Sequence, residues 1–328
     1  IRGYWSSEHL VEVIQILARN RHVLDKINQN FISQASQLVL KTWYKTRKNS
    51  LSGSRKNIAE HYDLSNDFFK LFLDSSMMYS SAVYKHKDMT LEEASDYKKE
   101  LICQKLQLKP MDHLVEIGSG WGGFAIYAAQ HYGCKVTTIT ISQAQYDEAT
   151  KRIADAGLSH RVNVQLKDYR LLEGKFDKLV SIEMIEAVGE QYLSTYFNKC
   201  RALLKPNGLG LIQAITIEDA RYKKALNTVD YIKRYIFPGS FIPCISVLTQ
   251  AASEQQLRLK HLEDIGLSYA ETIHQWRERF LNAKEHILAL GFDENFIRMW
   301  DFYLCYCEGG FKEGVISDVH LLFEASAY

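Results

Sequence analysis

The amino-acid sequence predicts an α/β fold in which a mostly parallel seven-stranded sheet carries helices on both faces. Two observations predict it: a glycine-rich turn directly follows a short apolar strand, and beyond Pro110 strand-like segments alternate with segments of helical periodicity. Successive strand, helix and strand units are right-handed and bring their strands together in parallel. Strict alternation therefore predicts a parallel sheet covered by helices.

The seven strands and the helices between them follow from residue patterns. Strands are expected where short runs are rich in β-branched residues, and helices where apolar residues recur every three or four positions. Pro206 and Gly208 are expected to stop the helix that precedes the fifth strand. The expected strands are 115–117, 134–141, 162–168, 176–184, 209–217, 257–265 and 316–325, and the helices between the first five are 122–133, 143–157 and 191–208.

The N-terminal part differs in composition from this α/β region. Apolar residues between Ser6 and Trp43 have mostly helical spacing, and Lys41 to Lys56 then carries six cationic residues and no acidic one. We interpret 1–56 as a helical N-terminal extension with a basic linker, and 57–328 as the main domain. The linker is either a solvated connection or a contact for anionic lipid headgroups.

Composition excludes several function classes. A net charge of +1 over 328 residues argues against a chain-wide nucleic-acid surface. The six cysteines show no metal-ligand spacing, so no metal site is expected and free thiols in a reducing compartment are the default. No apolar run reaches the roughly 18 residues of a spanning helix, and a cytoplasmic protein is expected.

The glycine turn identifies the type of cofactor. Gly118, Gly120 and Gly123 fit the spacing of a dinucleotide fingerprint, in which an acidic residue at the end of the second strand holds the ribose. That strand ends in 138–142 without a carboxylate, whereas Glu116 precedes the first glycine. A carboxylate there would repel a pyrophosphate but suits a cationic or zwitterionic ligand. S-adenosylmethionine, which carries an ammonium group and a sulfonium, fits better.

Several longer motifs carry a closer resemblance. The chain resembles the cyclopropane-fatty-acyl-phospholipid synthase family, which includes the mycolic acid cyclopropane synthases and has the Rossmann-like class I methyltransferase fold. The resemblance extends from about Asn57 to the C-terminus. The motifs are "HYDLSNDFFKLFLD" (61–74), "MMYSSAVY" (77–84), "EIGSGWGG" (116–123), "TISQAQ" (140–145), "IEMIEAVG" (182–189), "YIFPG" (235–239) and "YAETIHQWRERF" (269–280).

The resemblance implies transfer of a methyl group from S-adenosylmethionine to a cis double bond in a phospholipid acyl chain, followed by proton loss and closure of a cyclopropane ring. It places 217–256 as a substrate-binding lid within a catalytic domain over 57–328. The residues that it places around the methyl donor, together with Glu116, are Tyr79, Ser80, Gly118, Gly120, Thr140, Ile141, Gln145, Asp168 and Tyr169.

The same resemblance implies a bicarbonate ion as the base. Glu186, Tyr269 and the amide of Ile215 match the family's bicarbonate ligands, but Ser81 and Gln213 stand where the family has Cys and His. Ser and Gln can still donate hydrogen bonds to an anion. Two alternatives to ring closure remain open: a methyl or methylene branch, and an inactive lipid-binding homologue. Tyr62, like Tyr269, is expected to face the pocket.

A lipid substrate implies docking on the inner face of an anionic membrane without a spanning helix. Besides the linker, the stretch 221–241 combines basic and aromatic residues suited to headgroup contact and to a lid. A homodimer is compatible with the sequence, and no nucleic-acid partner is expected. The basic residues of this stretch are Arg221, Lys223, Lys224, Lys233 and Arg234.

Overall fold

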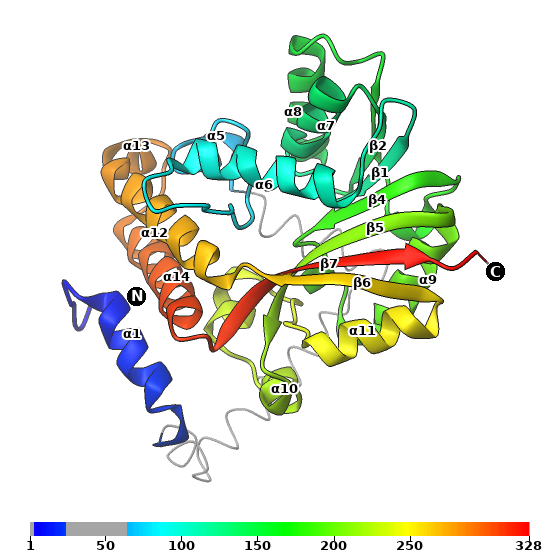
Figure 1. Cartoon of the computed structure of the whole chain (residues 1–328). Helices are drawn as coiled ribbons and strands as arrows, with labels where there is room; N and C mark the ends of the chain where they lie inside the picture. The colour runs from blue at the N-terminus through cyan, green and yellow to red at the C-terminus, as the bar shows by residue number, and fades with distance from the viewer. Residues whose placement is uncertain (1–2, 24–63, 328) are drawn as a thin grey trace.

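The computed structural model describes residues 3–23 and 64–327, and a seven-stranded sheet forms its centre (Figure 1). The strand order is β3-β2-β1-β4-β5-β7-β6. The first five strands pair in parallel, and β7 pairs antiparallel with both β5 and β6. This confirms the predicted mostly parallel sheet. The strands are β1 (His113–Ile117), β2 (Lys135–Thr140), β3 (Val162–Leu166), β4 (Phe176–Ile182), β5 (Leu204–Ile217), β6 (Leu257–Asp264) and β7 (Ile316–Ala325).

Helices cover both faces of this sheet, as predicted. On one face, Leu114 and Val136 pack with α6 (Leu91–Lys105), α7 (Gly123–Tyr132) and α8 (Gln143–Asp155). On the other face, Val115 and Ile117 point toward a core formed with α9 (Leu193–Leu203) and α11 (Ile245–Glu254). Alternate residues of each strand therefore serve two separate cores.

One predicted boundary is wrong. Helix α9 ends at Leu203, before Pro206, and β5 already begins at Leu204. The residue before a proline is disfavoured in helical conformation, which explains an extended Lys205. Asn207 has a positive φ of 59°, so the chain turns there before the buried part of β5.

A third layer of helices stands at one end of the sheet (Figure 1). Its core is aromatic, with Phe68, Phe72, Trp276 and Trp300 almost fully buried against one another. None of the helices in the described ranges is both long and apolar enough to cross a bilayer. The helices of this layer are α1 (Leu10–Arg19), α5 (Asn66–Lys70), α12 (Gly266–Asn282), α13 (Lys284–Ala289) and α14 (Glu294–Lys312).

The predicted lid connects β5 to β6. It contains α10 (Asp219–Leu226), a short π-helix η4 (Ile232–Ile236) and α11. Three 3₁₀ turns lie elsewhere: η1 (Tyr169–Leu171), η2 (Ile185–Ala187) and η3 (Glu190–Tyr192). The basic linker over 41–56 and Tyr62 lie outside the described residues, so the expectations placed on them stay predictions.

Candidate active site

A single cavity of about 880 Å³ runs from the carboxyl ends of the parallel strands toward the third layer of helices. Its position matches the general rule that open α/β sheets bind ligands beyond the carboxyl ends of their strands. The cavity has a polar end at the glycine turn and a more apolar end beside the segment 217–256, which was predicted to form a lid. All ten residues predicted to bind the methyl donor line it: Tyr79, Ser80, Glu116, Gly118, Gly120, Thr140, Ile141, Gln145, Asp168 and Tyr169.

The glycine turn brings the main chain close to the cavity. Gly118 and Gly120 have positive φ values of 98° and 48°, a region that glycine adopts without steric cost. A Cβ atom on Gly118 would also lie 3.2 Å from Cγ of Met184. These two positions therefore leave a space that a larger residue would fill, which fits a ligand held against the backbone.

Glu116 lies at the bottom of the polar end and is 2% exposed. Thr138 Oγ1 donates a hydrogen bond of 2.5 Å to its carboxylate. Burial raises the pKa of Glu116 to about 8, with the Thr138 hydrogen bond acting in the opposite direction. Such a carboxyl group lacks a cationic partner among the described side chains and suits the ammonium group of a ligand.

The second strand ends in neutral hydrogen-bonding groups, as predicted. Thr140 Oγ1 donates to Gln145 Oε1 at 2.8 Å, and Ser142 caps α8 by accepting from the Gln145 amide at 3.3 Å. Asp168 is 2% exposed and pairs with Arg170 at 2.7 Å. The polar lining thus combines the carboxyl group of Glu116, the Asp168–Arg170 ion pair and neutral hydrogen-bonding groups.

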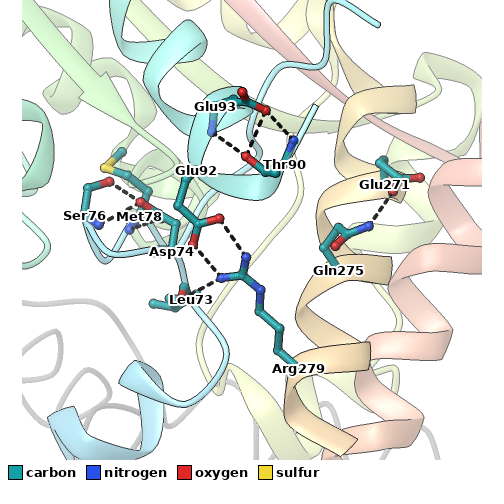
Figure 2. Close-up of polar contacts among 10 residues, drawn as sticks. All are labelled: Leu73, Asp74, Ser76, Met78, Thr90, Glu92, Glu93, Glu271, Gln275 and Arg279. Atoms are coloured by element: carbon teal, nitrogen blue, oxygen red, sulfur yellow. Dashed lines mark hydrogen bonds and ion pairs between the residues drawn. The ribbon is translucent and has the colours of Figure 1, made fainter. Parts of the chain in front are cut away.

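A loop between α5 and α6 forms one wall and is held from both sides (Figure 2). The Asp74 carboxylate accepts hydrogen bonds from the backbone amides of Ser76 at 2.8 Å and Met78 at 3.0 Å. Arg279 of α12 binds Glu92 of α6 through two contacts of 2.8 Å and also donates to the Leu73 carbonyl at 3.3 Å. These contacts fix the loop that carries Tyr79 and Ser81.

The centre of the cavity holds a residue that the sequence analysis missed, Glu183. Its carboxylate accepts hydrogen bonds from the Ser81 amide at 2.7 Å, Gln213 Nε2 at 2.8 Å and the Tyr269 hydroxyl at 2.6 Å. It also has a positive φ of 46°, which is unfavourable for a residue with a side chain. Strained backbone of this kind persists only where its surroundings fix it, and it clusters at functional sites.

Glu186 lies one turn further along and lines the same cavity. Its Oε1 accepts a hydrogen bond of 2.6 Å from the Ile215 amide, whereas its buried Oε2 has no partner among the described residues. Burial, and then the nearby charge of Glu183, raise the pKa of Glu186 to about 8. Glu186 therefore borders the cavity with one carboxyl oxygen that no described residue hydrogen-bonds.

Asp318 and Lys98 complete a buried charged cluster around Glu183. Gln213 Nε2 also donates to Asp318 at 2.7 Å, and burial followed by repulsion from Glu183 raises the pKa of Asp318 well above its ordinary value. Lys98 donates to the Ser80 hydroxyl at 2.6 Å; burial lowers its pKa to about 8, while Glu183, Asp74 and Asp318 oppose that shift. One buried cation therefore offsets several buried acids.

The structure thus rearranges the predicted base. Ser81, Gln213 and Tyr269 do converge, but on Glu183, and the Ile215 amide is taken by Glu186. The Ser81 hydroxyl donates to the Ala82 carbonyl at 2.8 Å and does not face the cavity. The predicted donors are occupied by carboxylates of the chain, so they do not fit an additional bicarbonate ion.

The segment predicted to form a lid borders the apolar end of the cavity. Arg221, Lys224 and Phe237 line the cavity, and the Phe241 amide donates to the Glu186 carbonyl at 3.0 Å. Lys233 was expected at the headgroup surface, but it is 6% exposed and donates to the carbonyls of Ala225 and Thr228. That part of the prediction is wrong, because the ammonium group ties the π-helix to α10.

Comparisons with known proteins agree with this geometry. The family model of mycolic acid cyclopropane synthetase matches residues 49–321. The tuberculostearic acid methyltransferase UfaA1 of Mycobacterium tuberculosis is 36% identical, covering 96% of this chain and 74% of the relative. The cyclopropane-fatty-acyl-phospholipid synthase of Escherichia coli K12 is 40% identical over 77% of this chain and 63% of the relative.

Solved structures lead to the same family. The cyclopropane synthase MmaA2 of Mycobacterium tuberculosis has a TM-score of 0.77 and 28% identity, covering 82% of this chain and 98% of that structure. The mycolic acid cyclopropane synthase CmaA1, solved with S-adenosylhomocysteine and CTAB, gives the same values. The chain therefore belongs to the mycolic acid cyclopropane synthetase family and is an S-adenosylmethionine-dependent methyltransferase with the class I fold.

Proposed function

We propose that this enzyme methylates a cis double bond in the acyl chain of a phospholipid and that Glu183 then removes a proton, leaving a methylene branch. The observation that carries the proposal is the position of Glu183. It lines the cavity and accepts hydrogen bonds from the Gln213 and Tyr269 side chains, which the family resemblance assigns to bicarbonate, and from the backbone amide of Ser81. A side chain of the protein thus stands where a separate ion would act.

S-adenosylmethionine, when bound, supplies an electrophilic methyl group. Glu116 and the turn at Gly118 and Gly120 would hold its polar part, since they form the polar end of the cavity. The π electrons of the substrate form the new carbon–carbon bond as the sulfur–methyl bond breaks, and the neighbouring carbon becomes cationic. The cavity contributes by orienting the double bond of the substrate against the methyl donor.

Aromatic side chains suit the cationic stage. Tyr79, Phe237, Tyr269 and Tyr303 all line the cavity, and the Tyr79 hydroxyl lies 3.1 Å from the Tyr303 hydroxyl. Aromatic faces attract a cation by roughly 0.5–2 kcal/mol per contact. The rings therefore stabilise positive charge without offering a nucleophile that would trap it.

Loss of a proton neutralises the carbocation and completes the reaction. A hydride shifts from the methylated carbon to its cationic neighbour, and Glu183 takes a proton from the new methyl group as a carbon–carbon double bond forms. Proton loss before the hydride shift would close a cyclopropane instead. Two observations favour methylene formation. Glu183, and not a bicarbonate ion, accepts the hydrogen bonds of Ser81, Gln213 and Tyr269. The tuberculostearic acid methyltransferase also aligns with 96% of this chain.

The test is product analysis with a donor labelled by three deuteriums on its methyl group. The purified enzyme is incubated with vesicles of dioleoyl phosphatidylglycerol, and the acyl chains are examined by mass spectrometry and proton NMR. We expect two deuteriums to be retained together with the signal of a terminal methylene group. A cyclopropane signal would refute the branch, and three retained deuteriums would refute proton removal from the methyl group altogether.

We also propose that 217–256 is the acyl-chain lid and that its exposed cations meet anionic headgroups. Arg221 and Lys224 border the cavity, and Lys223 and Arg234 are exposed without lining it. Reversing the charge of Lys223 and Arg234 is expected to weaken binding to phosphatidylglycerol vesicles, since each basic residue near such a surface contributes about 1 kcal/mol. Unchanged vesicle binding, measured by cosedimentation, would contradict this role; Lys205→Glu, outside the lid, is the control.

A further inference from the structure

A row of polar side chains leads from Glu183 to the edge of the sheet. Gln213 on β5 pairs directly with His320 on β7, and His320 pairs directly with Glu263 on β6. Lys105, the last residue of α6, lies over this row and contacts both His320 and Glu263. Four elements far apart in sequence therefore form one line of contacts that ends at the proposed base.

The hydrogen bonds along this row can run in only one direction. A lysine ammonium group has three donors and no acceptor, so Lys105 Nζ, 2.7 Å from His320 Nδ1, must donate to that nitrogen. The His320 proton is then on Nε2, which donates to Gln213 Oε1 at 3.3 Å. The Gln213 NH₂ group is consequently turned toward Glu183 and Asp318, 2.8 and 2.7 Å away.

This direction matters because an amide has two orientations that differ by a half turn. With its oxygen toward Glu183 and Asp318, Gln213 would oppose two carboxyl groups and withdraw a donor from the base. His320 is fully buried and neutral, since burial and then the Lys105 and Lys98 charges lower its pKa well below the ordinary value. The tautomer of His320 alone therefore determines whether the oxygen or the NH₂ group of the Gln213 amide faces the imidazole.

We propose that Lys105 and His320 are positioning residues that fix the Gln213 amide and thereby keep Glu183 ready to accept a proton. The inference rests on the proposed role of Glu183 as the base. Neither residue lines the cavity, so both act through Gln213. The other charged or titratable groups facing Glu183 are Lys98, Glu186, Tyr269 and Asp318, and those facing His320 are Lys98, His261 and Glu263.

The informative variant is Lys105→Met, which removes the donor to Nδ1. Glu263 Oε2, 4.0 Å from Nδ1, then becomes the nearest partner, so the His320 proton moves to Nδ1 and Nδ1–H donates a hydrogen bond to Glu263. His320 Nε2 turns into an acceptor, Gln213 reverses, and Glu183 loses one of its three donors. A hydrogen bond to a charged group is worth enough to move a pKa by about one to two units.

The assay measures S-adenosylhomocysteine formation on dioleoyl phosphatidylglycerol vesicles as a function of pH. For Lys105→Met we expect the acidic limb of kcat to move up by about one to two pH units, a loss of about tenfold or more on that limb that disappears at high pH. The KM for S-adenosylmethionine should stay the same. Lys105→Arg keeps a donor and should restore the wild-type profile.

Two controls separate this effect from a loss of stability. Lys205→Met removes a surface ion pair with Asp177 of 2.7 Å, and it should leave kcat and the pH profile unchanged. In a Glu183→Gln background, Lys105→Met should add no further loss of kcat, because Lys105 affects catalysis only through Glu183. A Lys105→Met enzyme with a lower melting temperature but an unshifted pH profile would overturn the positioning role.

The two proposals fail in different ways. If Glu183→Gln retains wild-type kcat, Glu183 is not the base and the proposed mechanism is wrong. If Glu183→Gln is inactive while Lys105→Met has the wild-type pH profile, the mechanism stands and the positioning role is wrong.

Discussion

Replacing Glu183 by glycine tests the proposed base most directly, because the backbone there favours glycine. The φ of 46° costs an ordinary L-residue about 1–2 kcal/mol. Glycine relieves that strain but increases the entropy of the unfolded chain, at about 0.4–1 kcal/mol. The two effects nearly offset each other, so the backbone contribution to the stability of Glu183→Gly is expected to stay within about 1 kcal/mol of the wild type.

The activity of Glu183→Gly, unlike its backbone stability, should fall sharply. Loss of a general base typically lowers kcat by about 10²–10⁴-fold. In Glu183→Gly, however, the Ser81 amide, Gln213 Nε2 and the Tyr269 hydroxyl lose their shared acceptor. A small anion placed between them would satisfy all three donors, so added bicarbonate is expected to restore part of the lost rate.

The assay compares S-adenosylhomocysteine formation in bicarbonate-free buffer and after titration with bicarbonate. Glu183→Gln serves as the matched control, because its amide fills the same space and should be inactive with or without bicarbonate. Wild-type activity of Glu183→Gly in bicarbonate-free buffer would refute the assignment of the base. A folded Glu183→Gly enzyme that is inactive and does not respond to bicarbonate would refute the idea that the three donors form an anion site.

Two further predictions concern the other buried carboxyl groups. Because burial raises the pKa of Glu116 to about 8, Glu116 is mostly protonated at pH 7, and binding of a cationic methyl donor should release a proton. Calorimetry in buffers of different ionisation enthalpy should detect this release for the wild type and should detect none for Glu116→Gln. Glu186 has a folded-state pKa of about 8, above its ordinary 4.5, so the native state holds this proton more tightly and stability falls as the pH rises between these values. Glu186→Gln removes that loss, and its gain in urea-unfolding free energy over the wild type should be larger at pH 8 than at pH 5; an equal gain at both would contradict the shifted pKa.

The parts of the fold and site that depend on local sequence were predictable. The glycine turn, Glu116 and the neutral end of the second strand are near one another in the chain, and all the predicted donor-binding residues do line the cavity. The boundary of α9 was missed because Pro206 was treated as the stop of the helix, whereas the residue before it is already extended. Local signals located the elements better than their ends.

The base was harder to predict because its partners come from separate elements. Glu183 and Glu186 are three residues apart in "IEMIEAVG", and the family resemblance points only to Glu186. What distinguishes Glu183 is its positive φ and its hydrogen bonds to Ser81, Gln213 and Tyr269, none of which a sequence pattern encodes. The signal that was present was a second acid directly after a buried strand, at the edge where α/β sheets place their sites.

The two neighbouring carboxyl groups differ in the charges and donors that surround them. Burial raises the pKa of Glu183 above its ordinary value, although the charge of Lys98 and the hydrogen bonds from Tyr269 and the Ser81 amide oppose that shift. Glu186 has one donor and a free oxygen, and both burial and the Glu183 charge raise its pKa. Environments that separate the pKa values of paired acids assign one to accept a proton and the other to stay neutral. In its ionised form, Glu183 is held by three hydrogen bonds and can take a proton from the cationic substrate. Its neutral neighbour leaves the cavity with less negative charge to trap the cation.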